Sequence, residues 1–200
     1  MTAAGLLALG VLAQGCRSRQ PEMTAYVSIK ELMQNEIDPI ADNIFDAVAT
    51  DITANGIVET KPTTDEDWEK VAIGAVTLLE ATNLLRIPRR VAPPGDTNKS
   101  EGPNAPELSP EQIAVNIDKD RALWNTHVDG LRDVALEALA TVKAKNADAL
   151  FEVGGKLDKA CENCHLEYWY PGDRKAVLED EQKRATLPKP PAQRKPDSAK

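Results

Sequence analysis

The pentapeptide Cys161-Glu162-Asn163-Cys164-His165 constrains this 200-residue chain more than any other feature. Its CxxCH pattern is typical of the covalent attachment of a c-type haem. On a helix the two thiols and the imidazole lie at positions i, i+3 and i+4, so they share one face. The thiols can then form thioethers with the vinyl groups of one haem while the imidazole reaches the iron. We therefore expect one covalent haem c on Cys161 and Cys164, with His165 as the proximal iron ligand.

Two other chemistries use paired cysteines and remain alternatives. A structural zinc site needs four ligands, and the chain offers only Cys16 and His127 beyond the motif. A thioredoxin-type redox pair would follow a strand in a βαβ unit, whereas this pair lies late in a helical stretch. The pattern favours haem over both.

The composition and the spacing of apolar residues predict an all-α fold. Aromatic residues make up only 4% of the chain, and β-branched runs are scarce. A first helix is expected over residues 24–55, with Pro39 bending it near Glu36 and Gly56 ending it. The apolar residues that recur at spacings of three and four in this stretch are Ile29, Met33, Ile37, Ile40, Ile44 and Val48.

Three further helices are indicated by capping signals. The second begins at Thr64, with Asp67 three residues later as its capping-box partner, and ends before Pro88. The third begins at Ser109 and is expected to run unbroken to about residue 145. Asn146 caps the fourth, which carries the CxxCH motif. Four such helices predict an antiparallel four-helix bundle with a covalent haem near the end of the last helix.

Glycines and prolines mark other features along the chain. The pair Gly154-Gly155 is costly in the middle of the fourth helix. It indicates either a local kink or the close approach of a neighbouring helix or the porphyrin. Residues 89–108 hold several prolines and are expected to form a long surface loop. The bundle is expected to span residues 24–172, and the charged, proline-rich residues 173–200 are expected to be a disordered tail.

The first residues predict export from the cytoplasm. Residues 1–15 are apolar and too short to span a membrane well, which fits an export signal. They end in Leu12-Ala13-Gln14-Gly15-Cys16, which resembles a bacterial lipobox. We therefore expect a lipid on Cys16, followed by a spacer over residues 16–23, and a periplasmic location on a membrane surface. Simple signal cleavage and an uncleaved anchor are the alternatives.

Charge and motif content limit the function classes. The formal net charge is −8 at pH 7, which argues against nucleic acid as a partner and suits a basic redox protein. The sequence has no nucleophile–base pairing and no phosphate-binding loop. We therefore expect an electron carrier and not an enzyme.

A four-helix chain with CxxCH near the end of its last helix resembles the cytochrome c′ family, the class II c-type cytochromes. The resemblance covers about residues 24–172. In low-spin members a Met on the first helix is the distal iron ligand, and Met33 is similar in position. In gas-binding members an apolar side chain shields the iron there, and Leu32 is the candidate for that role. His127 on the third helix is a third alternative as ligand.

The resemblance also suggests roles for residues around the haem. Trp124 is expected to pack on the haem edge or in the core, and Tyr168 to cover the proximal face. Lys30 is a candidate partner for a propionate. Family members often dimerise through their first two helices, so a homodimer is possible here.

These features predict a monohaem cytochrome that transfers electrons in the periplasm through a haem ligated by His165 and Met33. One alternative is a five-coordinate haem protein that captures or senses NO or CO. Another is a haem subunit of a membrane-associated oxidoreductase.

Overall fold

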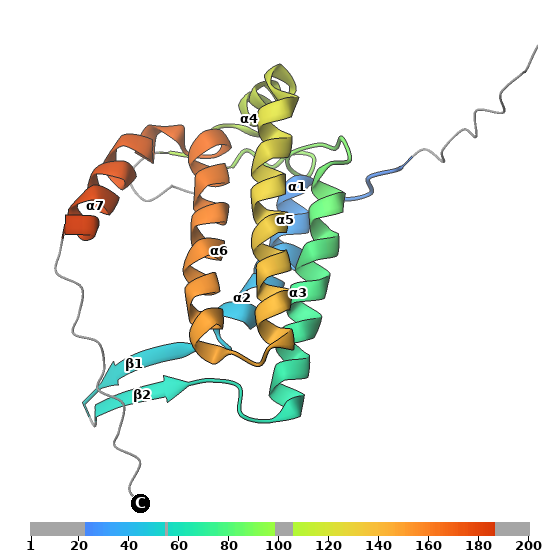
Figure 1. Cartoon of the computed structure of the whole chain (residues 1–200). Coiled ribbons are helices and arrows are strands. Elements are labelled where there is room, and N and C mark those ends of the chain that lie inside the picture. The colour runs from blue at the N-terminus through green and yellow to red at the C-terminus, as the bar shows by residue number, and fades with distance from the viewer. Residues whose placement is uncertain (1–22, 55, 99–105, 187–200) are drawn as a thin grey trace, which may run out of the picture.

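The computed structural model describes residues 23–54, 56–98 and 106–186, which are mostly helical, as predicted, with one small two-stranded sheet (Figure 1). The lipobox and Cys16 lie outside these residues. In chain order the elements are α1 (Ile29–Leu32), the π-helix η1 (Met33–Ile37), α2 (Asp38–Phe45), β1 (Ala49–Thr53), β2 (Gly56–Thr60), α3 (Asp65–Leu85), α4 (Pro110–Lys119), α5 (Arg121–Lys143), α6 (Ala147–Tyr168), the 3₁₀-helix η2 (Pro171–Asp173) and α7 (Arg174–Thr186).

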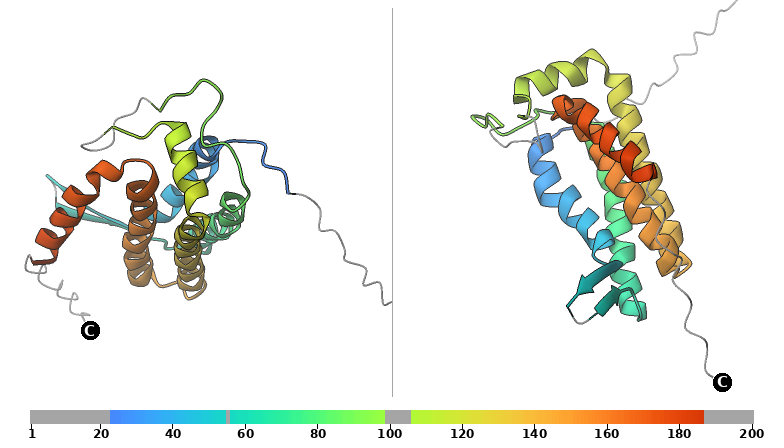
Figure 2. Two further views of the ribbon diagram at one scale, coloured as in Figure 1. Left: turned by 90° about the horizontal axis from the view of Figure 1, so that it is seen from above. Right: turned by 90° about the vertical axis from the view of Figure 1, so that its left-hand side faces the viewer.

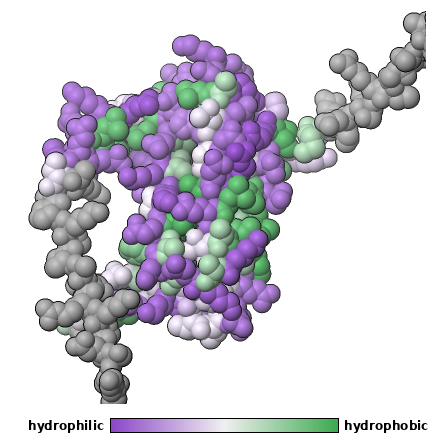
Figure 3. All heavy atoms as spheres, viewed as in Figure 1, coloured by the Kyte–Doolittle hydropathy of each residue, from purple (hydrophilic) through white to green (hydrophobic). Residues whose placement is uncertain are grey.

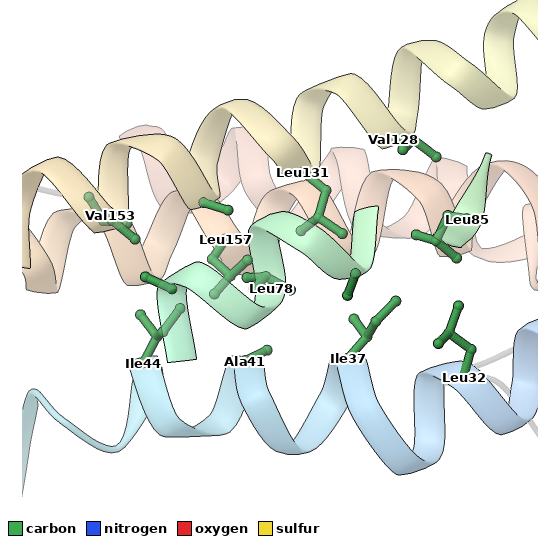
Figure 4. Packing of buried hydrophobic residues seen from close by; sticks show 14 of the residues in the cluster. Leu32, Ile37, Ala41, Ile44, Leu78, Leu85, Val128, Leu131, Val153 and Leu157 are labelled. Carbon is green, nitrogen blue, oxygen red and sulfur yellow. The ribbon is translucent and has the colours of Figure 1, made fainter. Parts of the chain in front are cut away.

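The long helices pack side by side around a shared apolar core. α3 packs along α5, α5 packs along α6, and α2 contacts both α3 and α6 (Figures 1 and 2). Each fully buried Leu or Ile side chain contributes about 1.5–3 kcal/mol to this packing. The core residues that Figure 4 labels are Leu32, Ile37, Ala41, Ile44, Leu78, Leu85, Val128, Leu131, Val153 and Leu157.

The single first helix predicted over residues 24–55 is wrong at both ends. The helical segment begins after Ser28, whose hydroxyl accepts a hydrogen bond from the Glu31 N–H, and ends at Phe45. Pro39 cannot donate a backbone hydrogen bond, and the segment widens into the π-helix η1 just before it. The distortion expected near Glu36 therefore takes the form of a π-turn that carries Met33.

A β-hairpin replaces the last part of that predicted helix. β1 and β2 pair antiparallel, with Ala49 opposite Thr60 and Thr53 opposite Gly56. Gly56 has a φ of 119°, which glycine adopts at little cost and other residues do not. Gly56 therefore begins the second strand of the hairpin and does not end a helix. Thr and other β-branched residues are dense here, which favours strands.

The other helix starts are confirmed, with one break. Thr64, Ser109 and Asn146 cap α3, α4 and α6 with their side chains. The third predicted helix, however, is divided into α4 and α5 at Asp120, whose backbone leaves the helical region. The Asp120 carboxylate accepts a hydrogen bond from the Leu123 N–H at 2.9 Å and so caps a new helix.

The expected disordered tail over residues 173–200 is wrong for its first part. η2 and α7 continue the ordered chain to Thr186, and residues 187–200 lie outside the described part. α7 is rich in Lys, Arg, Glu and Ala, which are strong helix formers. It also carries the i,i+4 ion pair Lys175–Glu179 at 3.9 Å.

The face of the molecule seen in Figure 3 is largely hydrophilic, with smaller hydrophobic patches between the helices. Within residues 23–54, 56–98 and 106–186, no helix combines the length and the apolar character that crossing a membrane requires.

The cap of α3 predicts a pH-dependent stability. The Asp67 carboxylate accepts hydrogen bonds from the backbone N–H groups of Thr64 (2.9 Å) and Thr63 (3.1 Å), which lower its pKa to about 2. Because the folded-state pKa lies below the unfolded value, this contribution is present near neutral pH and is lost as the pH falls through about 2. We expect Asp67→Asn to lower the free energy of unfolding at pH 7 and to lower it much less near pH 2. Urea denaturation at both pH values measures this.

The control is Glu69→Gln, which removes the same charge from the exposed side of α3. An Asp67→Asn effect that is equal at both pH values would contradict this account of the cap.

Candidate functional site

The CxxCH residues lie on the last turns of α6 and line a cavity of about 30 Å³. The residues around it come from four segments of the chain that are distant in sequence. These are Met33 and Ile37 of η1 with Asp38 of α2, Leu85 at the end of α3, Trp124, His127, Val128 and Leu131 of α5, and Ala160, Cys161, Cys164 and His165 of α6. The two cysteines and the histidine therefore face one space, as the motif predicts for a helix.

A second cavity of about 180 Å³ adjoins the first. Met33 and His165 line both cavities, so these two side chains lie where the cavities adjoin. Met33 comes from η1 and His165 from α6. The structure therefore brings the predicted distal and proximal ligands to the same cleft. The remaining residues of the second cavity are Lys30, Gln34, Glu107, Trp169 and Tyr170.

Both motif thiols are free and protonated in this environment. Burial, together with smaller effects of the nearby carboxylates of Asp38, Asp158 and Glu162, raises the pKa of Cys161 to about 11. Burial raises the pKa of Cys164 to about 12. A thioredoxin-type pair needs a thiol with a lowered pKa. These shifts run the other way, and the motif follows helices and not a strand.

His165 is held neutral and oriented by its neighbours. Burial lowers its pKa, against the opposing effect of Glu162 and other carboxylates, so the imidazole is in the form that binds a metal. Its ring lies 6.1 Å from the Trp169 ring and 5.9 Å from the Tyr170 ring. The Tyr170 hydroxyl donates to Glu162 at 2.8 Å, which fixes that side of the cleft.

Trp124 is a fully buried part of the site. Its indole N–H donates to the Leu85 carbonyl at 2.9 Å and so ties α5 to the end of α3. Its ring meets Tyr168 edge-on, with 5.2 Å between centroids. Trp124 lines the first cavity and is also part of the buried core.

Tyr168 does not line either cavity and packs behind Trp124 and His127. Its side chain is buried, and within the described residues its hydroxyl has no hydrogen-bond partner. Burial raises its pKa to about 12, so the hydroxyl stays neutral.

The remaining candidate residues from the sequence, His127, Leu32 and Lys30, differ in whether they line the cavities. His127 lines the first cavity, and burial lowers its pKa, so it remains an alternative ligand. Leu32 is buried in the core and lines neither cavity. Lys30 lines the second cavity, but its amine already pairs with Asp96 at 2.8 Å and contacts the Asn98 amide oxygen at 3.3 Å.

Sequence reasoning missed Asp38, Glu107 and the apolar lining of the cleft. Ile37 follows Met33 by one turn on the same apolar stripe, so helical spacing could have identified it. Asp38 is exposed at the cavity, and Glu107 comes from the proline-rich loop. No local pattern marks either carboxylate, because their position depends on how distant segments pack.

No family model, curated protein or solved structure matches this chain. In the part of the chain that the structure describes, no three or more His, Cys, Asp or Glu side chains gather in a way that could hold a metal ion. The site is therefore defined by its own geometry: two partly buried thiols, the neutral imidazole of His165 and the Met33 side chain around one cleft.

The contrast between Trp124 and Tyr168 is testable by stability. We expect Trp124→Phe to lower the free energy of unfolding by about 1–3 kcal/mol, because it leaves the buried Leu85 carbonyl without its donor. Tyr168→Phe removes a hydroxyl that has no partner, so we expect a change of less than about 0.5 kcal/mol or a small gain. Urea denaturation followed by circular dichroism measures both. Equal losses in the two variants would show that the Tyr168 hydroxyl is bonded.

Proposed function

We propose that this chain is a monohaem c-type cytochrome of the cytochrome c′ type that carries electrons. Its fold would be an antiparallel four-helix bundle formed by α1–α2, α3, α5 and α6, with the haem near the end of α6. The packing of α2 on α3, α3 on α5, α5 on α6 and α6 on α2 supports this. The observation that carries the proposal is the single cleft in which Met33 and the CxxCH residues meet.

The donor set fits a haem c. Two thiols at i and i+3 match two vinyl groups, and the neutral imidazole of His165 follows directly. A porphyrin is larger than either cavity, so its insertion requires η1 and α6 to move apart. The π-turn of η1 lies on the moving side, and such turns are frequent at functional sites.

The residues of the chain would each have a distinct task. Cys161 and Cys164 would hold the haem covalently, while His165 and Met33 would bind its iron. Bound haem supplies one-electron redox chemistry. Ile37, Leu85 and Leu131 would exclude water from the cleft, and a dry, apolar site with a Met ligand favours a higher reduction potential. Two fixed axial ligands would keep the coordination the same in both oxidation states.

A second candidate function is a five-coordinate haem that captures or senses NO or CO. The apolar lining on the Met33 side supports it, because such a surface can also shield an open iron position. A role as the haem subunit of a membrane-associated oxidoreductase is a third candidate. Met33 and His127 are the residues that decide between an open and a closed iron.

The location proposed is the periplasmic face of a membrane, through a lipid on Cys16. The acidic net charge of −8 supports a basic redox protein as partner and not a nucleic acid. A homodimer is compatible with this proposal. A Cys16→Ser chain should move from the membrane fraction to the soluble fraction if the lipid is the anchor.

Replacement of Met33 tests the axial ligand. We expect the reduced native holoprotein to be low-spin and not to respond to CO. Met33→Ala should show high-spin bands in the visible spectrum before CO is added, because its sixth position is open, and should then bind one CO per haem.

The matched control is Met23→Ala, which removes the same side chain from a residue that is 67% exposed and lies outside the helices. It should leave the spectrum unchanged. A native protein that binds CO readily, with Met33→Ala indistinguishable from it, would favour the gas-binding alternative.

Replacement of the cysteines tests the covalent links. Each of Cys161→Ala and Cys164→Ala should leave one thioether, which shifts the pyridine haemochrome band toward that of unlinked haem. The double variant should release its haem to acidified solvent. Cys16→Ser serves as the control and should keep both links. Full haem retention in the double variant would exclude this attachment site.

A further inference from the structure

A second cleft, which shares no lining residue with the two cavities at the CxxCH motif, lies between the β-hairpin and the N-terminal part of α6. Two cavities of about 280 and 410 Å³ form it, and they share Val48, Phe151 and Glu152. Its α6 side is one stripe of residues at helical spacing: Asp148, Phe151, Glu152, Gly155 and Asp158. We refer to this cleft as the hairpin groove.

The floor of the hairpin groove is aromatic and apolar. Phe151 is 53% exposed, and Phe45 lines the same space. These are the two phenylalanines of the chain. An aromatic side chain that is half exposed in a groove offers a contact surface, because burying it on binding is favourable.

The rim of the hairpin groove is acidic. Asp148, Glu152 and Asp158 form no ion pair with any side chain in the described ranges. Lys61, the cation at this groove, is paired with Glu59 at 3.7 Å. The groove therefore presents carboxylates without counter-ions beside an apolar floor.

The glycine pair of α6 opens onto this groove. A Cβ atom on Gly155 would meet nothing within 4 Å, and one on Gly154 would meet only the Phe45 ring at an ordinary 3.7 Å. Alanine would thus fit at both positions, and each glycine costs the helix about 1 kcal/mol relative to alanine. Neither a neighbouring helix nor the haem cleft explains Gly155. The backbone of α6 is open there to a chain that approaches from outside.

The segment that follows α7 has the chemistry that this groove would recognise. Residues 187–200 carry Lys189, Arg194, Lys195 and Lys200 against the single carboxylate side chain of Asp197. The prolines of the same segment are Pro188, Pro190, Pro191 and Pro196. Proline-rich segments bind aromatic-lined grooves at a low entropic cost, because their extended conformation is largely preformed. We propose that residues 187–200 dock in the hairpin groove of the same chain.

The length of the segment permits this contact. Fourteen residues in an extended, proline-rich conformation reach about 43 Å at about 3.1 Å per residue. α6 has 22 residues and is about 33 Å long at 1.5 Å per residue. α7 starts near the C-terminal end of α6 and ends on the side of the molecule from which the hairpin projects (Figures 1 and 2). Because α7 turns back alongside α6 toward the hairpin end, the distance that residues 187–200 must cross is shorter than the length of α6, and the groove lies within their reach.

The docked segment would place its cations against the rim and its prolines against the floor. Lys189 and Lys195 would neutralise the carboxylates of Glu152 and Asp158, and the proline rings would cover Phe151. The small surface of Gly155 would admit the backbone. This contact is independent of haem, so it can hold or fail without affecting the proposed electron-carrier function.

A carbodiimide that joins amines to carboxylates tests the contact in the full holoprotein. Chains of natural isotope content are mixed with ¹⁵N-labelled chains, and cross-linked peptides are mapped by mass spectrometry. We expect links from Lys189 or Lys195 to Asp148, Glu152 or Asp158, all within a single isotopic species. Links of mixed isotopic content would show that the segment of a second copy fills the groove, which would overturn the proposal. Links of these lysines only to carboxylates elsewhere would also overturn it.

Two variants separate docking from chance proximity. Gly155→Leu fills the groove without harming the helix, since Leu favours helix more than Gly does. Phe151→Ala removes the aromatic floor, and we expect each to lower the yield of the groove links about tenfold. The matched control is Gly130→Leu, at an exposed glycine of α5 whose Cβ would also meet nothing within 4 Å. If Gly155→Leu gives the same yield of groove links as the Gly130→Leu control, the result would contradict the proposal.

Discussion

The face that Cys161, Cys164 and His165 share on α6 is the constraint on which the rest of the site depends. Helical geometry places the three side chains together, and the packing of α6 against α5 turns them toward the core. Burial then keeps both thiols protonated and the imidazole neutral. Thiols with raised pKa values are unlike those of a reactive thiol pair, and the neutral imidazole is the form that binds a metal.

The opposite side of the cleft depends on a local departure from the α-helix. Pro39 withholds one backbone donor, and the chain widens into a π-turn that carries Met33, which lines the same cavities as His165. Trp124 supports the cleft from α5 by its hydrogen bond to the end of α3. The arrangement supports the proposal of a haem with two axial ligands from the chain. The hairpin groove lies at the other end of α6 and serves a separate purpose in our account.

Much of the helical framework could be predicted because its signals are local. Thr64, Ser109 and Asn146 are caps whose partners lie within three residues, and the CxxCH spacing defines a helical face by itself. The β-hairpin was missed because Val48 continues the apolar stripe of the first helix, which masks the β-branched residues after it. The break at Asp120 and the cavity positions of Asp38 and Glu107 depend on packing between distant segments. The pairing of Met33 with His165 came from a resemblance, and the packing of α6 against the rest of the chain places the two residues at one cleft.

X-ray absorption at the iron edge of the purified full-length holoprotein tests the central claim most directly. The account predicts one sulfur neighbour of the iron, from Met33, in addition to the nitrogens of the porphyrin and of His165. A first shell that contains nitrogen alone, with either an open position or a second imidazole, would contradict it.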